Sequence, residues 1–102
     1  MAEITRNVVP EECKMDTSPA AGAMSGVVVV EADSFVHARD DEAIKLAREW
    51  AQSEWKFRQA AISSRPFNAK QVGLDGNPLT EEQAKDPGVA RMFRSSIRVS
   101  GT

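Results

Sequence analysis

Apolar residues recur every three or four positions between Asp40 and Ile62, the longest stretch of the chain with one period. They fall on one stripe of a helix, while most charged and amide side chains fall on the other side. Acidic residues at 40–42 complement the positive end of the helix dipole. Pro66 ends the pattern, because the residue before a proline avoids the α conformation. We therefore predict one long amphipathic helix over about residues 40–62, with an apolar stripe of Ala43, Leu46, Ala47, Trp50, Ala51 and Phe57.

Four consecutive valines, Val27 to Val30, form the strongest strand pattern in the chain. Side chains branched at Cβ are stiff in helices and pack well on a pleated surface. A run that is apolar on both faces is typical of a strand covered on both sides, or of one at a subunit contact. We expect this strand to pack against the long helix, with Trp50 buried between the two.

The N-terminal part has a looser pattern. Residues 1–9 resemble a short strand, and residues 10–26 are rich in Pro, Gly, Ala and Ser without any period. This composition is typical of a flexible arm or linker. We therefore divide the chain into an extended arm or linker over 1–26 and a small α+β domain over 27–102.

Two further elements are predicted after Pro66. The sequence Asp75-Gly76-Asn77-Pro78 favours either a tight hairpin or a loop that carries Leu74 and Leu79 into the core. Thr80 and Gln83 have the spacing of a capping box, which begins a short helix. Asp86-Pro87 is then expected to start a second helical turn that places Val89, Met92 and Phe93 on one side.

Residues 95–102 alternate Ile97 and Val99 with polar residues, which is typical of an edge strand or an extended tail. Neither this end nor residues 1–26 can bury enough of its own surface to offset the entropy of ordering, about 1–2 kcal/mol per backbone residue. We therefore expect at least one end to add to the sheet edge of a neighbouring subunit.

Charge is unevenly distributed along the chain. Residues 1–42 hold nine acidic and three basic side chains, whereas residues 43–102 hold six acidic and ten basic ones. Either the acidic half covers the basic half, within a chain or between copies, or the basic faces meet nucleic acid. The first alternative is favoured, because a nucleic-acid domain usually has a basic overall balance and this chain has a net charge of −2.

Side chains for catalysis and for metal binding are few. One cysteine, Cys13, and one histidine, His37, exclude both an internal disulfide framework and a cysteine-rich zinc site. The pattern at Asp75 and Asn77 lacks the further oxygen ligands of a calcium loop. No phosphate-binding glycine loop or nucleophile motif occurs. We therefore assign no catalytic, cofactor-binding or metal-ligating residue and expect a protein that is not an enzyme; a site shared between chains around His37 is the remaining enzymatic hypothesis.

No stretch is apolar over the roughly 20 residues that a membrane-spanning helix needs, and the N-terminus lacks the pattern of a secretory signal. These features favour a location in the cytoplasm, or in a particle such as a virion assembled there.

The two tryptophans are most simply core residues. The alternative is that one of them, with Phe57 and the basic residues nearby, forms a contact surface. Trp and Arg are enriched at the energetic centres of protein interfaces. The candidates on this basis are Trp55, Phe57, Arg58, Arg91, Arg94 and Arg98.

The sequence therefore predicts a small α+β domain in which the long helix packs on a short β-sheet. We expect a non-enzymatic structural or interaction protein, such as a virion or accessory subunit of a larger assembly. The alternative is a soluble regulatory binder that acts on one protein partner. Expected partners are another protein or copies of this chain; nucleic acid is less favoured, and no membrane or cofactor is expected.

Overall fold

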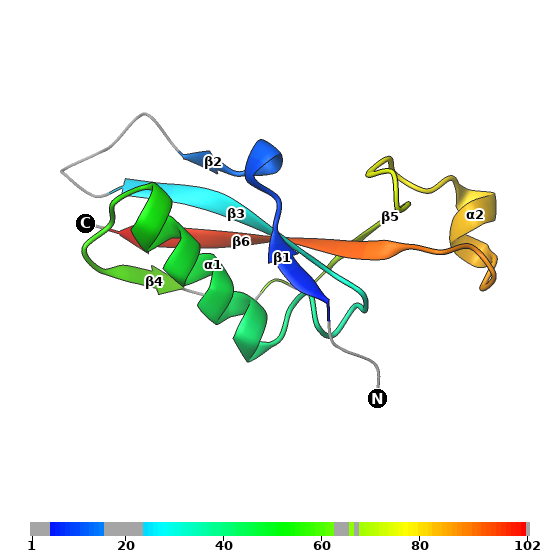
Figure 1. The fold of residues 1–102 in the computed structure, drawn as a ribbon, viewed down its shortest axis with the longest axis horizontal. Coiled ribbons are helices and arrows are strands. Elements are labelled where there is room, and N and C mark those ends of the chain that lie inside the picture. Colours follow the sequence, from blue (N-terminus) through cyan, green and yellow to red (C-terminus); the bar gives the residue numbers. More distant parts are fainter. Residues whose placement is uncertain (1–4, 16–23, 63–65, 67, 102) are drawn as a thin grey trace.

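The protein is an α+β domain in which one main helix packs on a six-stranded antiparallel sheet (Figure 1). This confirms the predicted fold class. A computed structural model describes residues 5–15, 24–62, 66 and 68–101. The elements in chain order are β1 (Arg6–Val8), a 3-10 turn (Pro10–Glu12), β2 (Lys14–Met15), β3 (Met24–Ala32), α1 (Asp41–Glu54), β4 (Ala60–Ile62), β5 (Lys70–Val72), α2 (Glu81–Lys85) and β6 (Met92–Gly101).

The two longest strands, β3 and β6, form the centre of the sheet. They pair antiparallel along the whole of β3, from Met24 opposite Gly101 to Ala32 opposite Phe93. β1 and β2 pair with the other edge of β3, whereas β4 and β5 pair with the other edge of β6. The valine-rich strand is therefore confirmed, and it is longer than predicted.

The C-terminal strand is central, so the predicted edge strand or tail is wrong. Its buried side chains, Ser95, Ile97 and Val99, alternate with exposed ones as predicted. The predicted second helical turn is also wrong, because Met92 and Phe93 already belong to β6. The long ladder with β3 satisfies the backbone of this segment better than one helical turn would.

The core lies between α1 and one face of the sheet. Val28 and Val30 of β3 and Ile97 and Val99 of β6 are buried there. The buried line of α1 consists of alanines, which let the helix approach the sheet closely. The prediction that Trp50 is fully buried is wrong, since this residue is half-buried at the edge of the core. The buried alanines are Ala43, Ala47 and Ala51.

The long helix begins as predicted but ends earlier. The carboxylate of Asp40 accepts a hydrogen bond from the backbone N–H of Ala43 at 2.9 Å, which caps the first turn. α1 ends at Glu54, and Lys56 has a left-handed φ of 61° that reverses the chain. Residues 60–62, predicted as helix, form β4 instead. The stop at residues 63–65 lies outside the described residues.

The described part of the N-terminal region pairs within its own chain. β1 and β2 both lie beside β3, and Arg6 of β1 forms an ion pair with Asp40 at the start of α1. Since β6 also pairs with β3, the prediction that one end adds to a neighbouring subunit's sheet is wrong for the described residues. Residues 1–4 and 16–23, which belong to the predicted arm, lie outside the described ones.

Candidate interaction site

One end of the molecule carries a lobe that extends beyond α1. β5, the loop after it, α2 and the first residues of β6 form this distal lobe, at the right of Figure 1. The molecule measures 48 × 31 × 21 Å, so the lobe lies at one end of an elongated shape.

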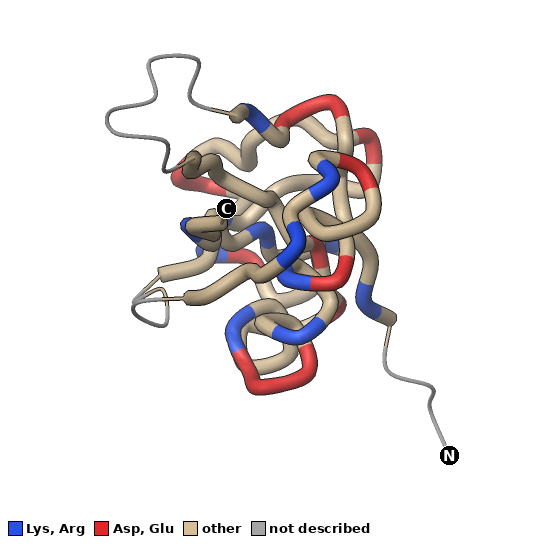
Figure 2. Tube along the Cα trace, turned by 90° about the vertical axis from the view of Figure 1, so that its left-hand side faces the viewer, with Lys and Arg blue, Asp and Glu red and all other residues tan. Residues whose placement is uncertain are grey.

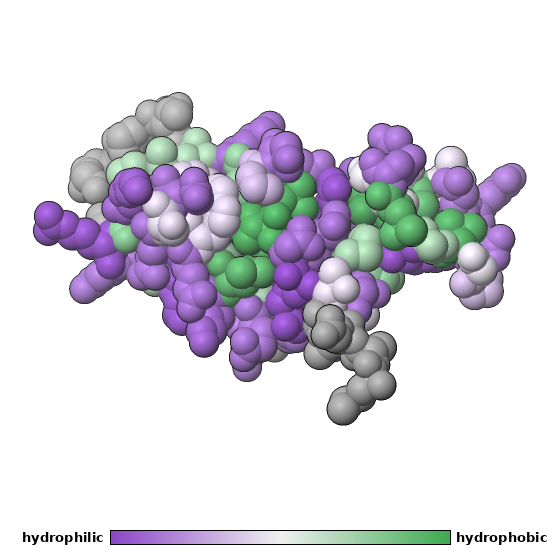
Figure 3. Space-filling view, viewed as in Figure 1, coloured by the Kyte–Doolittle hydropathy of each residue, from purple (hydrophilic) through white to green (hydrophobic). Residues whose placement is uncertain are grey.

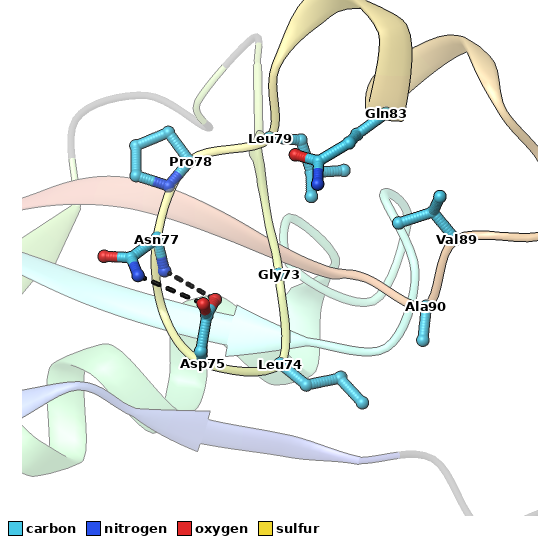
Figure 4. A pocket seen from close by; sticks show the side chains of 9 residues that line it. All are labelled: Gly73, Leu74, Asp75, Asn77, Pro78, Leu79, Gln83, Val89 and Ala90. Carbon is cyan, nitrogen blue, oxygen red and sulfur yellow. Dashed lines mark hydrogen bonds between the residues drawn. The ribbon is translucent and has the colours of Figure 1, made fainter.

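The loop of the distal lobe is held by its own hydrogen bonds (Figure 4). The carboxylate of Asp75 accepts hydrogen bonds from the backbone and the side-chain nitrogen of Asn77, at 3.1 and 3.0 Å. These bonds lower the pKa of Asp75. The backbone N–H of Gly73 donates to the carbonyl of Asn77, and Gly76 adopts a φ of 89° that favours glycine. The predicted turn is therefore confirmed, and its groups are satisfied locally.

The short helix α2 forms the other side of the lobe. The Thr80 hydroxyl accepts from the Gln83 N–H at 3.2 Å, and the Gln83 side chain accepts from the Thr80 N–H at 3.0 Å. The predicted capping box is thus confirmed.

Arg91 fastens α2 to the strands. Its guanidinium donates to the Gln71 side chain of β5 and to backbone carbonyls at the end of α2 and in the turn after it. A cation at this place adds a donor to carbonyls at the end of the helix and complements the helix dipole. Arg91, predicted as a contact residue, therefore stabilises the lobe.

A groove of about 360 Å³ lies between the loop and the segment around α2. Leu74 is 71% exposed beside it, and Leu79 and Val89 are half-buried in its walls. Figure 3 shows apolar side chains on the surface of this end of the molecule. The expectation that Leu74 enters the core is wrong, because α1 does not reach the lobe. The lining residues are Gly73, Leu74, Asp75, Asn77, Pro78, Leu79, Gln83, Val89 and Ala90.

The segments that form the groove are acidic, although they belong to the basic half of the chain. Residues 73–90 contain four acidic side chains and one lysine. The acidic residues are Asp75, Glu81, Glu82 and Asp86.

The other end of the molecule holds four of the predicted contact residues. Phe57 is only 4% exposed and belongs to the core. Trp55 is half-buried, with its ring 5.2 Å from that of Trp50 and 5.7 Å from that of Phe57. Arg58 and Arg98 are exposed. Figure 2, which faces this end, shows Lys and Arg interspersed with Asp and Glu, so the cations do not form one patch.

Arg94 lies on the face of the sheet opposite α1, between two acidic residues. Its guanidinium contacts Glu12 at 2.8 Å and Glu31 at 2.9 Å. Burial lowers the pKa of Arg94, but the hydrogen bond to Glu31 and the charges of both carboxylates outweigh this and raise it. These ion pairs join acidic residues of the first half to a basic residue of the second, as the favoured charge alternative predicts.

His37 and Cys13 have structural surroundings. The Nδ1 atom of His37 lies 3.1 Å from a carboxylate oxygen of Asp33 at the surface. The Cys13 thiol accepts a hydrogen bond from the Val29 N–H and donates one to the Val9 carbonyl, and burial raises its pKa. Among the described residues, no three His, Cys, Asp or Glu side chains gather in a way that could hold a metal ion.

In the described parts of the chain, neither helix is long and apolar enough to cross a membrane. Comparisons with protein-family models, curated proteins and solved structures give no match.

The groove residues were missed at the sequence level, although the sequence contained a signal for them. A tight turn at 75–78 is followed directly by a capping box at 80–83. This order places two short elements side by side without a long apolar segment to cover them. Leu74, Leu79 and Val89 are then the natural walls of a surface groove.

Proposed function

We propose that this chain is a non-enzymatic interaction protein, a small subunit of a larger assembly, and that the distal groove is its contact surface. The observation that carries this proposal is the exposed Leu74 beside a groove of about 360 Å³, on a lobe outside the core. Assembly in the cytoplasm, with a virion component as one concrete form, belongs to the same proposal.

The lobe is suited to binding because it is ordered before a partner arrives. Loop and helix satisfy their polar groups internally, through Asp75, the capping box and Arg91. A surface that is already ordered loses little conformational entropy on association. Apolar groups held on such a surface stay in contact with water unless a partner covers them.

A regulatory binder with a single protein partner is the second candidate. It is favoured by the closure of the core within one chain, because β1, β2 and β6 all pair with β3. A domain complete in this way folds without a second subunit, as an inhibitor or adaptor must.

The experiment for the proposal places a photoreactive amino acid at position 74 and, as the matched control, at position 36. Val36 is also exposed, at 63%, but it lies outside the groove. Irradiation in the native cell is expected to give a defined protein adduct from position 74 only. Adding Val89→Asp is expected to abolish this adduct by placing a charge in the groove wall.

Equal labelling from both positions, or none from position 74, would remove the groove as the contact surface. Light scattering of the purified complex then separates the candidates. An assembly subunit is expected to give a complex with several copies of the chain, whereas a regulatory binder gives one copy per partner.

A further inference from the structure

We infer that the distal groove takes a short segment of a different protein, in which one or two apolar side chains are flanked by lysine or arginine. This inference rests on the proposed function and names the chemistry of the partner.

The size and lining of the groove set the apolar part of the segment. Its volume is at the lower end of the range for binding pockets, about 300–1,000 Å³. Leu74, Leu79 and Val89 offer apolar contacts, while the nearby polar groups of Asp75 and Gln83 already bond within the lobe. One or two apolar side chains fill such a groove, and a polar side chain would find few free partners in it.

The charges in and around the groove set the flanking residues. Asp75 lines the groove, and Glu81, Glu82 and Asp86 lie in the same 73–90 segment with one lysine. The nearby cations are already engaged, since Arg94 pairs with Glu12 and Glu31 and Arg91 bonds to carbonyls of α2. Hydrogen bonds from Asn77 hold the Asp75 carboxylate in place. Lysine and arginine beside the apolar anchor meet this acidic surface favourably, whereas glutamate or aspartate would be repelled.

Among the residues that the structure describes, a second copy of the chain offers no free segment of this kind. The stretch that best combines large apolar and basic residues is Trp55-Lys56-Phe57-Arg58. Its aromatic rings are packed against Gly26 and Gly101 of the sheet, and Phe57 is buried. Two other such stretches are also held within the chain. In Arg91 to Arg94 the arginines bond to carbonyls of α2 and to Glu12 and Glu31, and in Ile97 to Val99 the apolar side chains are buried in the central strand. On these described residues, we assign the matching segment to another protein.

The test uses the full chain labelled with ¹⁵N and three pools of synthetic peptides. The first pool has leucine or phenylalanine flanked by lysine and arginine. The second replaces the basic residues by glutamate, and the third replaces the apolar residues by serine. The first pool is expected to shift the amide signals of residues 73–79 and 89–90 and to bind at least about tenfold more tightly than either other pool.

Three variants check where and how the first pool binds. Leu74→Asp is expected to weaken binding by about tenfold or more; it leaves the fold intact because Leu74 is 71% exposed. Val36→Asp, the matched control, is expected to leave binding unchanged. Replacing Glu81 and Glu82 by lysine is expected to weaken binding of the first pool and to strengthen binding of the second.

Several results would overturn the inference. The first is that the first pool shifts no amide signal in residues 73–90. The second is that the Leu74→Asp variant binds the first pool as tightly as the unchanged protein does. The third is that the second pool binds more tightly than the first. Concentration-dependent shifts of the groove signals without any peptide would identify a second copy as the occupant. None of these results changes the photocrosslinking result expected from position 74, which tests the proposed function. Failure of the inference can therefore be told apart from failure of the proposed function.

Discussion

The ring of Trp55 lies so close to Gly26 that a Cβ atom on this glycine would come within 2.6 Å of two ring carbons. The same relationship joins Phe57 to Gly101, where the distance would be 2.2 Å. Two glycines of the paired central strands thus receive the two aromatic side chains that follow α1. This packing fixes the reversal at Lys56 and directs the chain into β4.

Alanine at either glycine is expected to destabilise the protein. A Cβ atom at these distances forces the ring to move, which costs about 1–3 kcal/mol in the free energy of unfolding. Urea unfolding measures the loss. Gly88→Ala is the control, since the nearest atom to its Cβ is an exposed carboxylate oxygen at 3.3 Å. If Gly26→Ala and Gly101→Ala unfold like the control, the close packing of the rings is wrong.

Ala47 is expected to tolerate no larger side chain. It is fully buried where α1 lies on the sheet, so Ala47→Leu should push the helix outward and cost about 1–3 kcal/mol. Glu49→Leu, on the exposed side of the same helix, should change stability by less than about 0.5 kcal/mol. Thermal unfolding of both variants provides the comparison, and equal stability would show that another face of α1 is buried.

Removal of the Arg91 side chain is expected to loosen α2 without unfolding the core. Arg91→Ala removes the donor that the side chain supplies to Gln71 and to the carbonyls around the end of α2, at a local cost of about 1–3 kcal/mol in free energy. Hydrogen exchange should then quicken in residues 81–90 and stay unchanged in β3 and α1. Arg91→Lys should rescue little, because an ammonium group lacks the planar fork of donors. Arg98→Ala, at an exposed position, is the control; slow exchange in α2 after Arg91→Ala would contradict this role.

Arg94 is expected to matter more than an ordinary surface cation. Arg94→Met keeps much of the volume but leaves the half-buried Glu31 carboxylate without its partner. The free energy of unfolding of this variant, measured by urea unfolding, should fall by about 1–3 kcal/mol. Combining Arg94→Met with Glu31→Gln should recover part of this loss. A double mutant no more stable than Arg94→Met would show that the two side chains are not coupled.

Acidification is expected to loosen the 73–79 loop. The hydrogen bonds from Asn77 lower the pKa of Asp75 below its usual value of about 3.8. The ionised carboxylate therefore stabilises the folded loop above that pH, and this contribution is lost as the pH falls through the lowered pKa. The protection of the Asn77 amide, relative to its intrinsic exchange rate at each pH, should fall over this range, and in Asp75→Asn this protection should no longer change with pH there.

Local patterns predicted much of the fold, because the groups that determine them are close in sequence. The capping box at Thr80 and the turn at Gly76 depend on neighbours within a few residues, and both are confirmed. The end of α1 was wrong because it depends on glycines about 30 and 45 residues away, which only the folded sheet brings to Trp55 and Phe57. No local pattern reports such a contact.

The groove was missed for a related reason. The turn and the capping box mark two adjacent short elements, but the exposure of Leu74 also depends on how far α1 extends over the sheet, which the sequence of the loop does not encode. The sequence identified Arg91 and Arg94 as candidate contact residues. Their actual roles depend on which carbonyls and carboxylates the fold brings next to them. Residue type alone does not show whether an arginine bonds within its own chain or contacts a partner.

The position of β6 in the sheet has a consequence for how the protein is made. During synthesis β3 and α1 emerge early, but their apolar faces have no complete partner until Gly101 has left the ribosome. Contacts between residues about 70 positions apart must then form nearly together, which slows folding and leaves the valines of β3 open to wrong pairing in the meantime. A nascent chain stopped before residue 92 is therefore expected to expose these valines and to depend on chaperones.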